Sequence, residues 1–93
     1  MKVRWSSDAR QDRRAVFDYL FARNPAAAID MDDLFVDVST RLAKFPYSGH
    51  HGKLPGTREI LPHEHYRMVY QVEGDTVWIV ALMHTAQQWP PVT

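Results

Sequence analysis

The chain has 93 residues, which is enough for one domain with one core, so we expect residues 1–93 to form a single domain. Eleven Lys and Arg residues balance eleven Asp and Glu residues, so any nucleic-acid contact would have to come from a local patch. The lack of cysteine excludes disulfides, thiolate zinc sites and thiol nucleophiles. No apolar stretch approaches the roughly 20 residues of a membrane span, and no signal-peptide core follows the first residues, which predicts a cytoplasmic protein.

The first half of the chain predicts a strand and two helices. Residues 2–6 alternate polar and apolar, as in a short strand. A helix follows from Ala9 to about Arg23, capped by Ser7 or Asp8. One side of this helix carries Ala9, Val16, Tyr19, Leu20 and Arg23, and Phe17 and Phe21 widen its mainly apolar stripe. We expect Arg10, Asp12, Arg13 and Arg14 to lie on its solvated face.

The second helix has clear start and stop signals. Asn24 is a good N-cap and Pro25 suits the first helical position, where its missing N–H costs nothing. Pro46 ends the helix. An apolar stripe of helical period runs between them, formed by Met31, Leu34, Phe35, Val38, Leu42 and Phe45. The two helices therefore predict an antiparallel hairpin that must cover an apolar sheet.

The second half of the chain supplies that sheet. Residues 47–57 are rich in glycine and predict a loop that contains Lys53. Strands are expected at residues 58–62, 66–73 and 76–84, with a tight turn at Gly74-Asp75. On the middle strand, alternation separates the face of Tyr66 from the face of Arg67. The fold class is therefore α+β, in the order β-α-α-β-β-β, with a three-stranded antiparallel meander.

The last strand has two apolar faces, which is typical of a strand covered on both sides. One alternating set consists of Val77, Ile79, Ala81 and Met83. The other set consists of Trp78, Val80, Leu82 and His84.

Five histidines raise the question of a metal site. They are His50, His51, His63, His65 and His84. No carboxylate or sulfur residue completes a ligand spacing, so we interpret the first four as surface residues of loops and turns and expect no metal. The chain also lacks a Gly-x-Ser-x-Gly elbow and a glycine-rich phosphate loop, so hydrolase and nucleotide-binding sites and cofactors are not expected.

Arg58, Arg67 and His84 form the candidate catalytic set, because adjacent strands can bring them together at one end of the sheet. Two guanidiniums can hold a phosphate, and an imidazole can transfer a proton near neutral pH. This is the minimum for RNA cleavage through a 2′-hydroxyl. The structural alternative is that Arg58 pairs with Glu59 or Glu64, Arg67 with a helix aspartate, and His84 with a strand-end partner. Similarly, Trp89 is either a packing plug at the sheet edge or a stacking platform.

Several motifs in this order resemble the RelE/ParE superfamily of bacterial type II toxins over nearly the whole chain. They are Asn24-Pro25-Ala26-Ala27, Pro46 with Gly49 and Gly52, Gly56-Thr57-Arg58-Glu59, Tyr66-Arg67-Met68-Val69-Tyr70, and the ending from His84 to Gln88-Trp89-Pro90. The resemblance implies a helical hairpin packed on a mainly antiparallel sheet. It also implies a toxin that is held inactive by a cognate antitoxin, ParD-like or of another kind.

The superfamily contains two mechanisms. RelE-like members cut mRNA on the ribosome and are strongly basic, with a tyrosine or arginine near the C-terminus, whereas this chain is neutral and has none of Arg, Lys or Tyr after His84. The ending resembles the ParE branch, whose members poison DNA gyrase. We therefore expect a gyrase inhibitor that acts by protein contact, with a ribosome-dependent endoribonuclease and a detoxified binding module as the alternatives.

The resemblance assigns roles to particular residues. Arg58, Arg67 and His84 would line the functional face, with Lys53, Tyr66 and Trp89 as binding residues around it. The small size of the domain and its two amphipathic helices further predict an antitoxin segment docked on the hairpin in helix-in-groove fashion, with Phe17, Phe21 and Phe35 as candidate contacts and the core as the alternative place for each.

Overall fold

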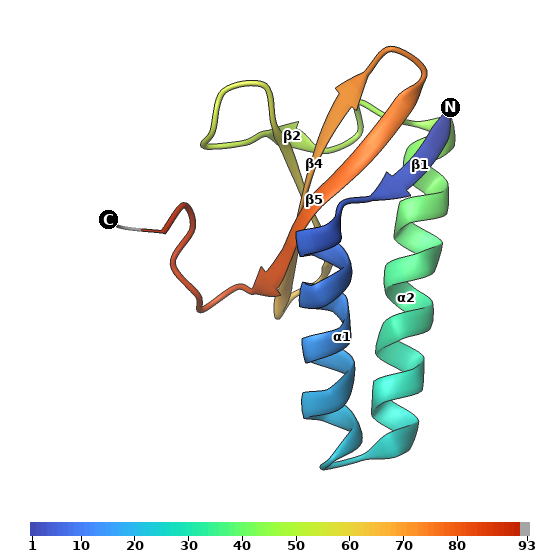
Figure 1. The fold of residues 1–93 in the computed structure, drawn as a ribbon, viewed down its shortest axis with the longest axis vertical. Coiled ribbons are helices and arrows are strands. Elements are labelled where there is room, and N and C mark those ends of the chain that lie inside the picture. The colour runs from blue at the N-terminus through green and yellow to red at the C-terminus, as the bar shows by residue number, and fades with distance from the viewer. Residues whose placement is uncertain (92–93) are drawn as a thin grey trace.

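The computed structural model describes residues 1–91 as a helical hairpin packed on a mixed sheet (Figure 1). The elements are β1 (Lys2–Trp5), α1 (Ser7–Phe21), α2 (Pro25–Lys44), β2 (His50–His51), β3 (Arg58–His63), β4 (Tyr66–Glu73) and β5 (Thr76–His84). The strands form one sheet of five in the order β1-β5-β4-β3-β2. β1 runs parallel to β5, and the other pairs are antiparallel. The α+β class and the β3-β4-β5 meander predicted from the sequence are confirmed.

Both helices begin at polar caps. The Asn24 side chain accepts a hydrogen bond from the N–H of Ala27 at 3.2 Å, as the Asn-Pro signal predicts. The cap of α1 is Ser6, whose hydroxyl accepts from the N–H of Ala9 at 3.1 Å, so the prediction of Ser7 or Asp8 is wrong by one or two residues. Several neighbouring polar residues can each satisfy a first-turn N–H, and the end of β1 decides which of them does so.

The apolar stripe of α2 supplies much of the core. Phe35, Val38 and Leu42 are almost fully buried. Phe45 departs from the prediction, because it is the C-cap with non-helical angles and its side chain is 63% exposed. Once the backbone leaves the helix, the helical period no longer sets the direction of a side chain.

The stripe of α1 is buried only at its beginning. Ala9 is buried, Val16 packs against the core, and Tyr19 and Phe21 are 56% and 49% exposed. Figure 1 shows the reason, because the connected ends of the two helices extend beyond the sheet. The predicted helical face therefore runs past the surface that it was expected to cover.

A β-bulge changes the face of several β5 residues. Tyr70 pairs with Ile79 and Val69 pairs with Ala81, so Val80 is the extra residue. Ile79 and Leu82 consequently face the helices with Tyr66, Met68 and Tyr70. Ala81 and Met83 pack with Val69 on the other face. The strict alternation predicted for β5 is wrong beyond Val80, and the register shift places His84 opposite Tyr66.

The glycine-rich segment is more ordered than the predicted loop. It contains β2, and the N–H of Gly49 donates to the buried Tyr70 hydroxyl at 2.9 Å. A Cβ at position 49 would approach that hydroxyl to 2.6 Å and the Glu59 carbonyl to 2.8 Å. Only glycine fits so close to the sheet, which fixes the loop against β3 and β4.

Across residues 1–91, neither helix combines the length and the apolar character needed to cross a bilayer.

Candidate functional site

A hollow of about 530 Å³ lies between the helical hairpin and the ends of β4 and β5. It is lined by Val16, Tyr19, Leu20, Met31, His65, Tyr66 and His84. The His84 ring stacks on that of His65, with centroids 5.6 Å apart and planes within 12°. It also meets the Tyr66 ring edge-on at 5.6 Å. Two of the predicted site residues, Tyr66 and His84, are therefore brought together.

The polar groups of this hollow have defined hydrogen-bonding states. Nδ1 of His84 accepts from the N–H of Ala86 at 3.0 Å, so the neutral ring carries its proton on Nε2. Burial raises the pKa of the Tyr66 hydroxyl above its ordinary value of 10.0, and Tyr19 raises it further. Tyr66 is therefore a neutral phenol near pH 7. The hollow offers an imidazole and a phenol on an apolar background, without a cation among its lining residues.

Arg67 lies on the opposite face of the sheet. It pairs in register with Met83, and its Nε lies 3.3 Å from Oε1 of Glu59. Glu59 is 3% exposed and also accepts from the Lys53 N–H at 3.1 Å. Nε2 of His50 lies 3.8 Å from the same carboxylate. Arg67 thus neutralises a buried carboxylate, and its partner is Glu59 rather than the helix aspartate considered from the sequence.

The guanidinium of Arg58, at the start of β3, is engaged by backbone carbonyls of the loop before β2. One of its guanidinium nitrogens donates to the carbonyl of Gly49 at 2.7 Å and to that of Tyr47 at 3.2 Å. The guanidinium carbon lies 5.1 Å from the centre of the Tyr47 ring. Arg58 therefore ties the loop before β2 to β3, and neither Glu59 nor Glu64 is its partner among the described residues.

The expectation that Arg58, Arg67 and His84 converge is wrong for this structure. On β4, Arg58 lies opposite Tyr70 and His84 lies opposite Tyr66, so the two side chains are four positions apart along that strand. That spacing corresponds to roughly 13 Å along a strand. Arg67 points to the other face. The register of three strands decides this arrangement, and the sequence alone did not reveal it.

Lys53 and Trp89, two further predicted binding residues, lie apart from the hollow. Lys53 is exposed, and its backbone, rather than its ammonium group, contacts Glu59. Trp89 packs against the cluster of Val69, Ala81 and Met83 on the outer face of the sheet. Its buried indole N–H has no acceptor among the described residues. Trp89 therefore shields the outer face of the sheet from solvent.

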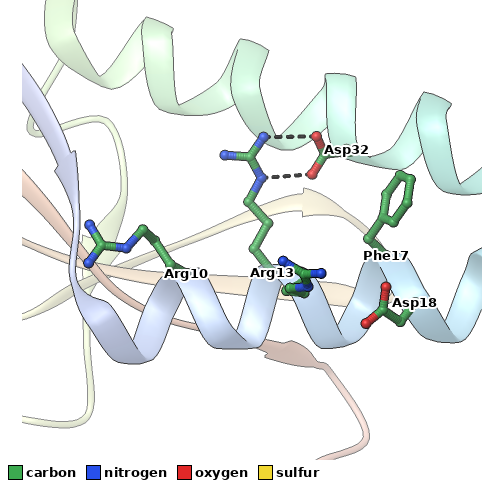
Figure 2. A pocket seen from close by; sticks show the side chains of 6 residues that line it. Arg10, Arg13, Phe17, Asp18 and Asp32 are labelled. Carbon is green, nitrogen blue, oxygen red and sulfur yellow. Dashed lines mark hydrogen bonds and ion pairs between the residues drawn. The ribbon is translucent and has the colours of Figure 1, made fainter.

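Phe17 and Phe21 stack on each other along α1, with ring centroids 5.6 Å apart. Neither belongs to the core clusters. Phe17 lines a second hollow, of about 490 Å³, with Arg10, Arg13, Arg14, Asp18 and Asp32 (Figure 2). In that hollow Arg13 donates to both carboxylate oxygens of Asp32, at 2.7 and 2.8 Å, and so joins α1 to α2.

Two features of the surface were missed by sequence reasoning. His65 lies in an exposed turn, as predicted, but the sequence did not reveal that its ring stacks on His84. Arg10 and Arg14 are exposed, as predicted for the solvated face of α1, whereas Arg13 is half-buried and bonds to Asp32 of α2, which the sequence did not reveal. Within residues 1–91, no three histidine or carboxylate side chains are placed to hold a metal ion together.

Comparisons with known proteins identify the class of this fold and then the family. The family model described as the ParE toxin of the type II toxin-antitoxin system parDE matches residues 3–89. A curated protein of Sinorhizobium fredii (strain NBRC 101917 / NGR234), named "Putative toxin Y4kP", is 32% identical over 92 residues. That similarity covers 98% of this chain and 95% of the relative.

Two solved structures share the fold. One, titled as the chromosomal ParDE TA system from P. aeruginosa, has a TM-score of 0.79 at 20% identity and covers 90% of this chain and 95% of that chain. The other, titled as the YoeB/ParE toxin from Agrobacterium tumefaciens, has a TM-score of 0.65 at 18% identity and covers 90% and 98%. The fold is thus that of the RelE/ParE superfamily. The family match then places the chain within it: this protein belongs to the ParE toxins of type II toxin-antitoxin systems.

Proposed function

We propose that this ParE-family protein acts in the cytoplasm as an inhibitor of DNA gyrase, by protein–protein contact and without a cofactor, and that a ParD-like antitoxin neutralises it. The observation that carries the proposal is the separation of Arg58, Arg67 and His84 over two faces of the sheet. A ribonuclease site would need cations and a proton-transfer group around one phosphate.

The contacts made by the two candidate arginines support contact inhibition over RNA cleavage. Arg67 neutralises Glu59, and Arg58 is bound to backbone carbonyls. Neither guanidinium faces the hollow that holds His84. Residues 85–91 add no lysine, arginine or tyrosine. His84 therefore lacks the cationic neighbours that would stabilise the pentacoordinate phosphorus of an RNA-cleavage transition state.

We assign the target contact to the hollow at the end of β5. Its apolar lining, with Tyr66 and His84 as polar groups, suits an inserted side chain of a partner protein. Arg58 and Arg67 then have a positioning role, since they hold the loop and the edge of the sheet in place. Lys53 and Trp89 lie outside this contact.

The antitoxin contact is assigned to the part of the hairpin that extends beyond the sheet. Tyr19, Phe21 and Ile29 are each about half exposed there. Phe17 and Phe21 form an aromatic pair outside the core. An amphipathic segment of an antitoxin could cover this surface, and the solved P. aeruginosa relative is titled as a ParDE system.

Induced expression in a naive bacterium tests the target. Gyrase poisoning should give filamentous cells and a DNA-damage response while bulk mRNA stays intact, and coexpression of the cognate antitoxin should restore growth. A ribosome-dependent nuclease would stop translation within minutes and leave codon-phased cuts in mRNA. Soluble protein that accumulates without growth arrest would instead indicate a detoxified binding module.

Replacement of His84 gives a second readout. His84→Gln keeps a polar side chain and removes the titrating imidazole. A contact inhibitor should lose about 1 kcal/mol of binding, roughly the worth of one neutral hydrogen bond. A nuclease that uses His84 for proton transfer should lose on the order of 10²–10⁴ in rate. Codon-phased cleavage that disappears in His84→Gln would contradict the gyrase assignment.

A further inference from the structure

A third hollow, at the β1 edge of the sheet, is lined by three arginines and two tryptophans. Its volume is about 330 Å³, and its lining residues are Arg4, Trp5, Arg10, Arg13 and Trp78. No carboxylate lines it. We call it the arginine–tryptophan hollow. It adjoins the hollow of Figure 2, because Arg10 and Arg13 line both of them.

Three elements build the arginine–tryptophan hollow. The parallel pairing of β1 with β5 places Arg4 directly beside Trp78. The chain turns at Ser6 into α1, which brings Arg10 back to donate to the Trp5 carbonyl at 3.3 Å. One turn further along α1, the Arg13 guanidinium lies 5.1 Å from the centre of the Trp5 ring. Four of the lining residues therefore lie between positions 4 and 13, and the pairing of β1 with β5 adds Trp78 from the other end of the chain.

The surface around this hollow is positively charged in a chain that is neutral overall. The two adjoining hollows are lined by four arginines, including Arg14, and by two aspartates, Asp18 and Asp32. The carboxylate of Asp32 forms an ion pair with the Arg13 guanidinium. Among residues 1–91, Arg4, Arg10 and Arg14 make no ion pair.

The carboxylate of nearby Asp12 does not neutralise these arginines, because it is directed elsewhere. It lies on α1, and its side chain accepts from the N–H of Leu82 at 3.0 Å. The carboxylate is therefore engaged with the edge of β5 beyond the end of β1, and it does not line either hollow.

We propose that the arginine–tryptophan hollow binds single-stranded nucleic acid, with the guanidiniums of Arg4 and Arg10 on phosphates and the indole ring of Trp78 on an unstacked base. Guanidinium groups match phosphate oxygens in a bidentate way, and aromatic side chains stack on bases of any sequence. An acidic peptide would use the cations but would not need the stacking face of Trp78 beside Arg4, so this aromatic side chain favours nucleic acid. The site lies apart from the hollow of His84 and goes beyond the proposed function.

The test measures binding of a labelled 12-mer of deoxythymidine, and of its uridine counterpart, to the purified full chain by fluorescence anisotropy. Because Arg4 and Arg10 would contact phosphates while Arg13 stays paired with Asp32, log K should fall with log salt with a slope of about −1.4. Arg4→Gln removes a cation that makes no ion pair among residues 1–91, so it should weaken binding and reduce that slope by about 0.7. Trp78→Ala should weaken binding roughly tenfold, and Trp78→Phe, which keeps an aromatic face, should retain most of it.

The matched control is Arg41→Gln, which removes an exposed arginine from the C-terminal turn of α2 and should leave binding unchanged. Thermal melts establish that each variant is folded, and Trp78→Phe with Arg4→Gln keeps the test decisive if Trp78→Ala does not fold. Absence of binding to both oligonucleotides at low salt overturns the proposal. So does binding that ignores Arg4 and Trp78. An octaglutamate peptide that binds equally well, with the same dependence on both residues, would assign the hollow to an acidic protein partner and also overturn it.

Discussion

At the scale of single residues, Glu59 is the charged group on which the loop before β3 depends. It is 3% exposed and is contacted by Arg67, by the Lys53 N–H and by His50. A buried carboxylate is tolerated only when charge and hydrogen bonds compensate its desolvation. The sequence showed Glu59 only as a neighbour of Arg58, because the partner of a strand residue is set by register and not by proximity along the chain.

Glu59→Gln should destabilise the fold by about 2–4 kcal/mol, because it leaves Arg67 facing a neutral amide in a mostly buried position. Urea unfolding at pH 7 measures this loss. Glu64→Gln is the matched control, since the Glu64 side chain is 80% exposed and should change stability by less than about 0.5 kcal/mol. Equal midpoints for the two variants would show that Glu59 does not hold the loop.

The Arg13–Asp32 pair should contribute stability that depends on pH. Hydrogen bonds from Arg13 lower the pKa of Asp32 below its ordinary value of 3.8. As pH falls, the unfolded chain therefore takes up the proton first, so the stabilisation is complete above 3.8 and is lost as pH falls through the lower folded pKa.

Asp32→Asn should consequently cost about 0.5–1 kcal/mol at pH 7, since both side chains are partly exposed, and this cost should shrink as the pH is lowered below 3.8. The difference in unfolding free energy between wild type and variant at several pH values measures this. A cost that stays constant as the pH is lowered would indicate that the carboxylate charge is not the source of the stabilisation.

At the scale of elements, the sequence predicted what local patterns determine. The bounds of β4 and β5, the Asn24 cap and the core face of α2 follow from turn residues, capping chemistry and apolar period. The parallel pairing of β1, the two-residue strand β2 and the bulge at Val80 depend on contacts between distant segments. The bulge alone moves His84 to the face of Tyr66, which is why the candidate site could not be assembled from alternation.

The extended end of the hairpin gives a prediction for antitoxin binding. Phe17→Glu and Phe21→Glu should each weaken binding of the cognate antitoxin by about 2 kcal/mol, or roughly 30-fold in Kd, because each introduces a charge into an apolar contact. The free protein should melt within a few degrees of wild type, since neither side chain belongs to the core clusters.

Phe45→Glu is the control for that experiment. Phe45 is 63% exposed at the far end of α2, so the same change should leave antitoxin affinity unaltered. Calorimetric titration and thermal melts together separate the outcomes. Parallel loss of fold and binding in the Phe17 and Phe21 variants would place these residues in the core instead.

At the scale of the whole molecule, a neutral chain divides into surfaces of different character. The hollow at His84 is apolar, the hairpin end carries exposed aromatic residues, and the β1 edge carries unpaired arginines. Composition gave the neutrality but not this distribution, because only the fold decides which charges lie together. The hollow at His84 and the hairpin end adjoin at Tyr19, which lines the first and is exposed on the second.

Incubation of purified gyrase and supercoiled DNA with this protein is the most direct test of the proposed target. The account predicts that cleaved DNA accumulates when the reaction is stopped with detergent and protease, and that the cognate antitoxin prevents this. The Phe45→Glu variant carries its change away from the His84 hollow. It should fold as wild type and cause the same accumulation of cleaved DNA. Unchanged gyrase activity, together with mRNA cleavage when the same protein is added to translating ribosomes, would contradict the account.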